Sequence, residues 1–473
     1  MFTEQELTSI RPSQRQLHIQ QLGFYAFIHF TVNTFTDREW GDGSEDPSVF
    51  CPEDLDARQW AEAIRDAGMK GIILTCKHHD GFCLWPTRLT SHSVSSSPWK
   101  AGQGDVVREV ADACRDTGLA FGIYLSPWDR HEPLYGSGKP YNDFFVGQLT
   151  ELLTGYGPVF AVWFDGACGE GPNGKRQTYD WERYYAVVRS LQPDACISVC
   201  GPDVRWCGNE AGQTRESEWS VVSSRMLDTE KIADKSQKAD NAEFRLRTLS
   251  ARDRDIGSRE ALEGESELVW YPAEVNTSIR PGWFWHESEN DQVKSVDQLR
   301  DIYMRSVGGN AMFLLNIPPD KRGRLYERDV CTLREFGTWL TSAFAHNLVQ
   351  ESFLSADSLP ETNLAPLLST NQTLSCCWAA PGKAPVLTLR LPDPTALGLL
   401  DIREAICDSQ RIERFTVDIS MDGKAWETVY AGTTIGARKL IDLQGHSACY
   451  LRLTVLASRL SPHFAFMGLY PAI

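Results

Sequence analysis

"RDAGMKGIIL", residues 65–74, decides the fold of this chain. A charged amphipathic segment stops at Gly68, and an apolar, β-branched run starts at Gly71. Upstream, Asp56 is placed to cap a helix, and Gly68 is the kind of residue that ends one. The same design recurs in "RDTGLAFGIY", residues 115–124, where Gly118 follows Gly68 by 50 residues. Each stretch is the corner between a helix and a strand, so the chain repeats one helix–strand unit.

The alternation of helices and strands continues on both sides of this repeat. Strands separated by helices over so long a span indicate a parallel sheet with right-handed crossovers. We predict an α/β fold, a (β/α)8-like barrel whose repeat need not be regular, over an open doubly wound sheet, since no G-x-G-x-x-G follows any strand. The expected strands are 23–30, 71–76, 120–126, 159–164, 195–200, 267–275 and 310–317. The expected helices are 56–71, 104–119, 144–156, 179–193 and 295–309, the last with a Ser295/Gln298 capping box.

After about residue 345 the apolar pattern changes to a period of two. Phe415, Val417, Ile419 and Met421 fall on one strand face, and Asp422-Gly423 supplies a hairpin turn. This pattern predicts a C-terminal antiparallel β-sandwich. We therefore expect a catalytic (β/α) barrel domain over residues 1–345 and a β-sandwich domain over 346–473.

Composition and charge exclude several classes of function. The chain has 473 residues and a net charge of −16, which argues against nucleic acid or an anionic membrane as a partner. Its 13 cysteines include no C-x-x-C pair, which favours free thiols over a disulfide framework or a zinc site. The N-terminal residues lack the apolar core of a signal peptide, so a cytoplasmic location is expected unless a leader was removed. No cofactor is expected, and no oligomeric state is predicted.

Asp165 ends the apolar run 159–164 and is followed by Gly166. A buried charge is costly unless it is paired or used. No helical pattern begins at Gly166, which weakens the alternative that Asp165 is a helix cap. Catalytic side chains of a (β/α) barrel project from the C-terminal ends of its strands. We interpret Asp165 as catalytic and Gly166 as leaving room for a ligand.

The other predicted strand ends carry histidines, tryptophans and carboxylates, few lysines and no phosphate loop. Neutral histidine and tryptophan suit a hydroxyl-rich, uncharged ligand such as a sugar. Two carboxylates on opposite sides of a sugar are the minimum apparatus for glycoside hydrolysis. A metal at "KHHDG" (77–81) is disfavoured, because adjacent residues on a strand point to opposite faces. The candidates at the strand ends, with Asp165, are His29, His78, His79, Tyr124, Trp128, Asp129, Trp163, Asp203, Arg205, Trp206, Glu210, Glu274, Arg280, Trp283 and Trp285.

Several segments in order resemble the glycoside hydrolase family 29 α-L-fucosidases. They are residues 26–60, 77–87, 162–167, 204–212, 217–222 and 269–286, which together cover almost the whole predicted barrel. The form "NTFTDREWGDG" (33–43) resembles the subfamily specific for α-1,3/1,4-linked fucose on branched, Lewis-type glycans. The barrel-plus-sandwich layout of that family agrees with the fold predicted above.

The resemblance implies a retaining exo-glycosidase that acts on a fucosylated oligosaccharide or glycoconjugate and needs no metal. Matched position by position, the nucleophile falls on Asp165 and the acid/base on Glu210. The resemblance then implies that Asp165 has the lower pKa of the two carboxyls and that they stand about 5–5.5 Å apart. The sugar-binding residues implied are His29, Trp40, His78, His79, Tyr124, Trp163 and Trp285. Glu39, Asp129, Glu170, Glu218 and Glu274 are competitors for secondary carboxylate roles.

The charged stretch 220–265 interrupts the alternation of helices and strands. A loop of this length inside a domain is either a functional rim segment or disordered, and the sequence leaves both open. As a rim segment it would contact the sugar next to fucose. Three other readings also stay open: a broader-specificity fucosidase, a retaining glycosidase for another sugar such as L-galactose, and a sugar-binding barrel without turnover.

Overall fold

The computed structural model describes residues 2–237, 240–245, 255–356, 364–368 and 377–473. Eight parallel strands form a nearly closed barrel in the order β5-β4-β3-β2-β1-β10-β9-β6. A single bridge between Ser198 and Val204 joins the two ends of this sheet. The predicted irregular (β/α) barrel is thereby confirmed. The strands are β1 (Phe24–Ile28), β2 (Gly71–Lys77), β3 (Ala120–Leu125), β4 (Ala161–Phe164), β5 (Cys196–Val199), β6 (Arg205–Trp206), β9 (Ala273–Ser278) and β10 (Ala311–Asn316).

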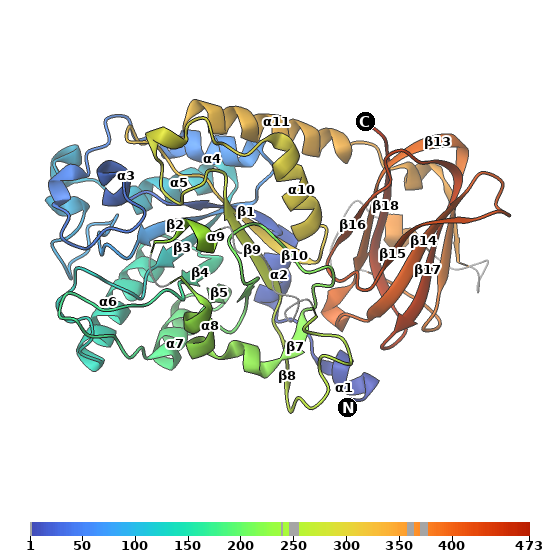
Figure 1. Ribbon diagram of the computed structural model, residues 1–473, viewed down its shortest axis with the longest axis horizontal. Coiled ribbons are helices and arrows are strands. Elements are labelled where there is room, and N and C mark those ends of the chain that lie inside the picture. Colours follow the sequence, from blue (N-terminus) through green and yellow to red (C-terminus); the bar gives the residue numbers. More distant parts are fainter. Residues whose placement is uncertain (1, 238–239, 246–254, 357–363, 369–376) are drawn as a thin grey trace.

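Helices cover the outside of the barrel, as Figure 1 shows. Those that alternate with strands are α4 (Ala57–Asp66), α5 (Val106–Thr117), α6 (Lys139–Gly155), α7 (Trp181–Leu191), α10 (Val296–Ser306) and α11 (Glu327–Ala343). The predicted end signals are present: Asp56 caps α4, Gly68 follows it with a φ of 88°, and Ser295 and Gln298 form the capping box of α10. Local sequence therefore sets where these helices start and stop.

The barrel departs from the predicted strands in two places. The run 267–275 is two strands, β8 (Leu268–Trp270) and β9, because β8 pairs antiparallel with β7 (Val221–Ser223) outside the barrel. No helix separates β5 from β6 within the described residues. Helix α2 (Gln14–Leu22) links the β5–β6 connection to the end of β8. Gln16 Nε2 donates to the carbonyl oxygens of Asp203 in that connection and of Trp270 in β8, at 2.9 Å each.

The C-terminal strands form a β-sandwich, as predicted (Figure 1). Strand β13 is 19 residues long and runs through both layers: its first part pairs with β11 and β17, and its second part with β16 and β18. Phe415, Val417 and Ile419 face the core, but Met421 is exposed because β14 ends at Ser420. The strands are β11 (Phe353–Ala356), β12 (Trp378–Ala379), β13 (Val386–Glu404), β14 (Ile412–Ser420), β15 (Glu427–Gly432), β16 (Lys439–Asp442), β17 (Ser447–Ser458) and β18 (His463–Pro471).

The sandwich is joined to the barrel beside the start of β10. Asn310 N donates to the carbonyl of Arg438 at 3.0 Å, and Leu440 N donates to the carbonyl of Gly308 at 3.0 Å. Leu440 packs into the hydrophobic core of the barrel. The predicted division at residue 345 falls in the connection between α11 and β11. Among the residues that the structure describes, no helix combines the length and apolar character needed to span a bilayer.

Candidate active site

The inward-facing side chains of the barrel strands lead directly to a pocket. On β1, Tyr25 and Phe27 face the interior cluster while Phe24, Ala26 and Ile28 pack under the helices. On β4, Ala161 and Trp163 face inward in the same way. Because side chains alternate along a strand, the next inward positions are His29 and Asp165, at the open C-terminal end of the barrel. Strand geometry alone therefore places these two residues at the barrel mouth.

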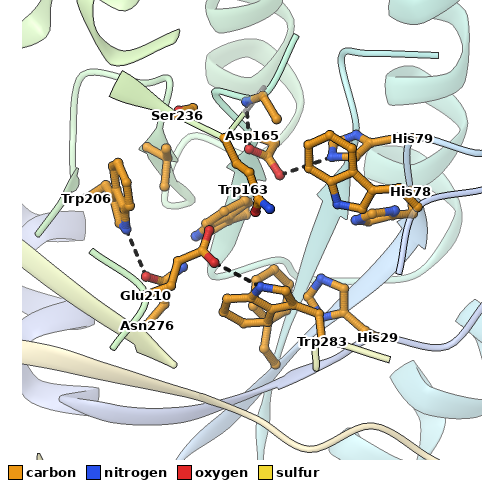
Figure 2. A pocket seen from close by; sticks show the side chains of 15 residues that line it. His29, His78, His79, Trp163, Asp165, Trp206, Glu210, Ser236, Asn276 and Trp283 are labelled. Atoms are coloured by element: carbon orange, nitrogen blue, oxygen red, sulfur yellow. Dashed lines mark hydrogen bonds and ion pairs between the residues drawn. The ribbon is translucent and has the colours of Figure 1, made fainter. Parts of the chain in front are cut away.

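The pocket at that mouth has a volume of about 560 Å³. Seven of the nine predicted site residues line it, and Figure 2 shows Asp165 and Glu210 beside the Trp163 ring. Those seven are His29, Trp40, His78, His79, Trp163, Asp165 and Glu210. The other lining residues are Phe27, Ala167, Val199, Trp206, Ser236, Gln237, Asn276 and Trp283.

Asp165 accepts hydrogen bonds through both carboxyl oxygens. Ala167 N donates to Oδ1 at 2.8 Å, and the Tyr124 hydroxyl donates to Oδ2 at 3.1 Å. Its side chain is 23% exposed, and His79 Nε2 lies 3.7 Å from Oδ2. Burial raises the pKa of Asp165 to about 6, against the smaller lowering effect of these hydrogen bonds. The prediction that Asp165 has the lower pKa of the two carboxyls stays a prediction.

Gly166 has a different role from the one predicted. A Cβ atom on Gly166 would lie 2.3 Å from Ser236 Oγ and 3.2 Å from a methyl group of Ile232. Both belong to the segment at α8 (Thr229–Lys235). Gly166 therefore makes room for this segment rather than for a ligand.

Three neutral histidines form one wall of the pocket. β2 ends at Lys77, so strand alternation no longer separates His78 from His79, and their ring centroids lie 4.1 Å apart. Burial lowers the pKa of His29 to about 4 and that of His79 to about 3, and it lowers the pKa of His78 well below its usual value. Uncharged imidazoles that can each donate or accept suit the hydroxyl groups of a neutral ligand.

Hydrogen bonds behind two of these rings fix their tautomers. Asn316 Nδ2 donates to Ser278 Oγ and to the carbonyl of Trp283, so its Oδ1, 2.8 Å from His29 Nδ1, is the acceptor. Ser126 Oγ donates to a carbonyl and lies 2.7 Å from His79 Nδ1, which must therefore carry a proton. Both rings then present an unprotonated Nε2. His79 Nε2 and Asp165 Oδ2 are both acceptors, so a ligand hydroxyl between them can donate to either.

Glu210 follows the short strand β6 and is oriented by a tryptophan. Trp283 Nε1 donates to Glu210 Oε2 at 3.1 Å (Figure 2). Trp285, which the resemblance implied as a sugar-binding residue, is not among the residues that line this pocket, and its ring centroid lies 6.3 Å from that of Tyr326. The main-chain N–H groups of Trp283 and Phe284 both bind Glu39, and this turn brings Trp283 to the pocket.

Tyr124 also lies outside the pocket lining, although it contacts Asp165. Its ring is fully buried in the barrel interior beside Trp163. The structure thus places Tyr124 behind the carboxylate, where its hydroxyl stabilises the charged form of Asp165.

The competing carboxylates have other partners. Asp129 pairs with buried Lys77 at 2.8 Å, and Glu218 pairs with Arg205 at 2.6 Å. Glu274 is completely buried and accepts from Tyr25 at 2.5 Å and from Trp163 at 2.8 Å. Burial raises the pKa of Glu274 to about 7. Glu170 is exposed on the loop after β4, and Glu39 holds the Trp283 loop.

The 220–265 segment reaches the pocket in its described part. Ser236 and Gln237 line the pocket, and Phe244 of α9 (Ala242–Arg245) stacks on Trp206 with ring centroids 6.3 Å apart. Trp206 is held from the other side, because its Nε1 donates to Asn276 at 2.9 Å. Residues 238–239 and 246–254 of the segment lie outside the described residues. The rim interpretation agrees with these contacts.

One group of residues outside the pocket has metal-ligand chemistry within the described part of the chain. Cys377, Asp408 and His463 lie together in the sandwich. His463 Nδ1 is 3.0 Å from Asp408, and its Nε2 is 3.0 Å from Arg411. Both ring nitrogens therefore already have partners, and the nearby guanidinium disfavours a cation.

Comparisons with known proteins identify the family of this chain. A sequence profile described as Alpha-L-fucosidase matches residues 11–343. Alpha-L-fucosidase 1 of Arabidopsis thaliana is 40% identical to this chain, over 97% of it and 87% of the plant protein. A putative α-L-fucosidase structure from Bacteroides ovatus shares 42% identity with a TM-score of 0.85, covering 100% of this chain and 76% of that one. A Ruminococcus gnavus GH29 fucosidase solved in complex with fucose shares 29% identity with a TM-score of 0.84, covering 98% and 95% of the two chains.

The mouth of this barrel brings carboxylates, neutral histidines and tryptophans into one pocket, which are the groups that a glycoside hydrolase uses. The profile match and the plant relative identify the family: this chain belongs to the glycoside hydrolase family 29 α-L-fucosidases. The predicted family and enzyme class are thereby confirmed.

Proposed function

We propose that this α-L-fucosidase removes terminal fucose with retention of configuration, using Asp165 as the nucleophile and Glu210 as the acid/base. One observation carries the proposal: the two carboxylates share one pocket with three neutral histidines at the C-terminal end of the barrel. Fucose is an uncharged 6-deoxy sugar, so it needs hydrogen-bonding partners without a net charge and apolar surface for its methyl group. Phe27 and the lining tryptophans offer that surface.

The reaction then has two steps. Asp165 Oδ attacks C1 while Glu210 gives its proton to the departing glycosidic oxygen, and a fucosyl-enzyme of inverted configuration forms. Glu210, now a carboxylate, takes a proton from water as that water attacks C1 and releases Asp165. The two inversions give net retention, and a separation of about 5–5.5 Å between the carboxyls is the geometry that this mechanism uses.

We further propose α-1,3/1,4-linked fucose on Lewis-type oligosaccharides as the preferred substrate. Glu210 protonates the leaving oxygen, so the leaving sugar has to lie on the side of Glu210. Trp206 is the last residue of β6, the strand that precedes Glu210, and its ring stacks on Phe244 of the rim, which gives that side an aromatic wall. Aromatic faces bind the C–H groups of pyranose rings, and a branched glycan offers a second sugar for this wall.

The substrate preference is tested with a panel of fucosides. We expect Lewis a and Lewis x trisaccharides to be cleaved with a kcat/KM at least about tenfold above that of the α-1,2-linked H trisaccharide, because a few rim contacts contribute about 1.4 kcal/mol or more. A nitrophenyl α-L-fucoside reports the chemistry without the rim, and a nitrophenyl α-L-galactoside tests the other-sugar alternative. Equal rates on the Lewis and H trisaccharides would favour a broader-specificity fucosidase.

The raised pKa of Asp165 predicts the acid limb of the pH profile. Asp165 attacks only as the carboxylate, and half of it is protonated at its pKa of about 6. We expect kcat/KM to fall below about pH 6, approaching tenfold per pH unit. Tyr124→Phe removes a hydrogen bond to the charged form, so the limb should move upward by about 0.4 to 1 unit. A limb near pH 4 in the wild type, or no shift in the variant, would contradict the assignment.

A further inference from the structure

The Trp283 indole contacts one oxygen of Glu210 and so favours the other as the carrier of a transferable proton. An indole N–H only donates, and that of Trp283 donates to Glu210 Oε2. Because the carbonyl oxygen of a carboxylic acid is its better acceptor, this contact favours protonated Glu210 with its proton on Oε1. Figure 2 shows this contact at the edge of the pocket, with the indole beside His29. Any displacement of Trp283 changes the direction in which Glu210 presents its proton.

The main chain of Trp283 is held from both sides. Its N–H donates to Glu39 Oε2 at 2.8 Å, and its carbonyl accepts from Asn316 Nδ2 at 2.8 Å. The N–H of the next residue, Phe284, donates to Glu39 Oε1 at 3.0 Å. One carboxylate thus binds two successive main-chain N–H groups. Glu39 is 6% exposed and is not among the residues that line the pocket.

An ion pair with His286 completes the contact between Glu39 and this loop. His286 Nε2 lies 2.8 Å from Glu39, and its Nδ1 lies 2.7 Å from Asp37. Glu39, as the largest cause, together with Asp37 and Glu289, raises the pKa of His286 to about 9, so both ring nitrogens donate. A Cβ on Gly282 would lie 2.5 Å from Glu39, which shows how closely the loop wraps the carboxylate.

We propose that Glu39 is a positioning residue for proton transfer: it holds the 282–286 loop so that the Trp283 indole orients Glu210. Glu39 acts through Trp283, since its carboxyl oxygens bind the loop rather than line the sugar pocket. The inference rests on the proposed acid/base role of Glu210.

The test is a leaving-group comparison on Glu39→Gln. Glutamine keeps one acceptor oxygen but turns an NH₂ group toward donors, so the loop loses its fixed position. Protonation of the leaving group matters for a sugar and hardly at all for an acidic phenol. We expect kcat/KM for a Lewis trisaccharide to fall about 10- to 100-fold, and that for an aryl fucoside with a strongly acidic phenol to change less than about threefold. Equal losses on both substrates, or no loss on either, would overturn the proposal.

Two further variants separate positioning from general damage. Trp283→Phe keeps an aromatic ring but removes the N–H. It should therefore show the same split between substrates, a large loss on the trisaccharide and a small one on the aryl fucoside. The Glu39→Gln/Trp283→Phe double variant should be no worse than the more affected single variant. Glu404→Gln is the matched control. Glu404 is buried in the sandwich and also accepts from main-chain N–H groups, those of Arg411, Ile412 and Gly436. It should lower the temperature of unfolding without any split between substrates.

The parallel measurement on Glu210→Ala distinguishes two kinds of failure. If Glu210→Ala shows the split and Glu39→Gln does not, only the positioning role of Glu39 is wrong. If Glu210→Ala shows no split, the acid/base assignment itself fails.

Discussion

Asp165→Asn should abolish turnover and at the same time make the protein more stable at neutral and alkaline pH. The amide has nearly the same shape as the carboxyl but is not a nucleophile, so kcat should fall by about 10⁴-fold or more. The amide oxygen still accepts from Ala167 N, and the NH₂ can donate to the Tyr124 oxygen, so the fold should survive. The loss of turnover is measured as the rate at which an aryl fucoside releases its phenol.

The gain in stability follows from the direction of the pKa shift. The pKa of Asp165 is raised in the folded protein to about 6, so the charged carboxyl destabilises the fold above that pH. The stabilisation present below the unfolded pKa is lost as pH rises through about 6. Removing the charge should therefore raise the free energy of unfolding by about 1–3 kcal/mol at about pH 8, allowing for partial exposure, and by almost nothing near pH 4.

Asp129→Asn is the matched contrast for this stability measurement. Asp129 also follows a barrel strand, but it pairs with Lys77, whose side chain is fully buried. Its replacement leaves that ammonium group unpaired and should cost about 3–5 kcal/mol. Thermal unfolding of both variants near pH 8 and pH 4 gives the comparison. Activity of Asp165→Asn within tenfold of the wild type would refute the nucleophile assignment. An unchanged stability of Asp165→Asn at pH 8 would refute the conclusion that the Asp165 charge destabilises the fold.

Glu210→Ala should lose activity in proportion to how poor the leaving group is. Without the acid, kcat/KM for a Lewis trisaccharide should fall by about 10²- to 10⁴-fold. An aryl fucoside with an acidic phenol should still form the fucosyl-enzyme, after which hydrolysis becomes slow because no base activates water. Azide needs no base, so it should restore kcat on this substrate.

The configuration of the azide product assigns both carboxylates. In Glu210→Ala, azide displaces Asp165 from the fucosyl-enzyme and should give the α-fucosyl azide. In Asp165→Gly, azide attacks the α-fucoside directly and should give the β-anomer. Glu274→Gln serves as the control, because Glu274 binds Tyr25 and Trp163 rather than the ligand pocket. It should slow all substrates alike and show no rescue by azide.

The barrel was predictable because its signals are local. Asp56, Gly68 and the Ser295/Gln298 pair mark helix ends by hydrogen bonds within a few residues, and the apolar runs mark most strands. Strand β6 has only two residues and leaves no pattern to recognise. The break at Tyr271-Pro272 depends on β7, which lies about 50 residues earlier in the chain. A short window of sequence contains no signal for strand pairing over such a distance.

Strand geometry predicts only part of the site, and Trp40, which also lines the pocket, was predicted from the family resemblance. His29 and Asp165 follow from inward alternation on β1 and β4. Trp283 and Trp285 are two residues apart in one loop, and the choice between them depends on hydrogen bonds to Glu39, a residue about 240 positions away. Asn276 had a weaker signal, since it lies two positions after Glu274 on β9 and so shares its face. Ser236 and Gln237 had none, because they lie in a charged segment without periodicity.

The contact between Gly166 and Ser236 has a consequence for how this enzyme can change through evolution. Proposed chemistry and proposed selectivity come from separate parts of the chain: the nucleophile from a core strand, and the outer wall from an insertion between β6 and β9. Such an insertion can accept substitutions that redirect the enzyme to other glycans while the barrel keeps its catalytic groups. The freedom ends at Ser236, which rests against the residue next to Asp165. A larger side chain at that one position would transmit a change in substrate range directly into the reacting centre.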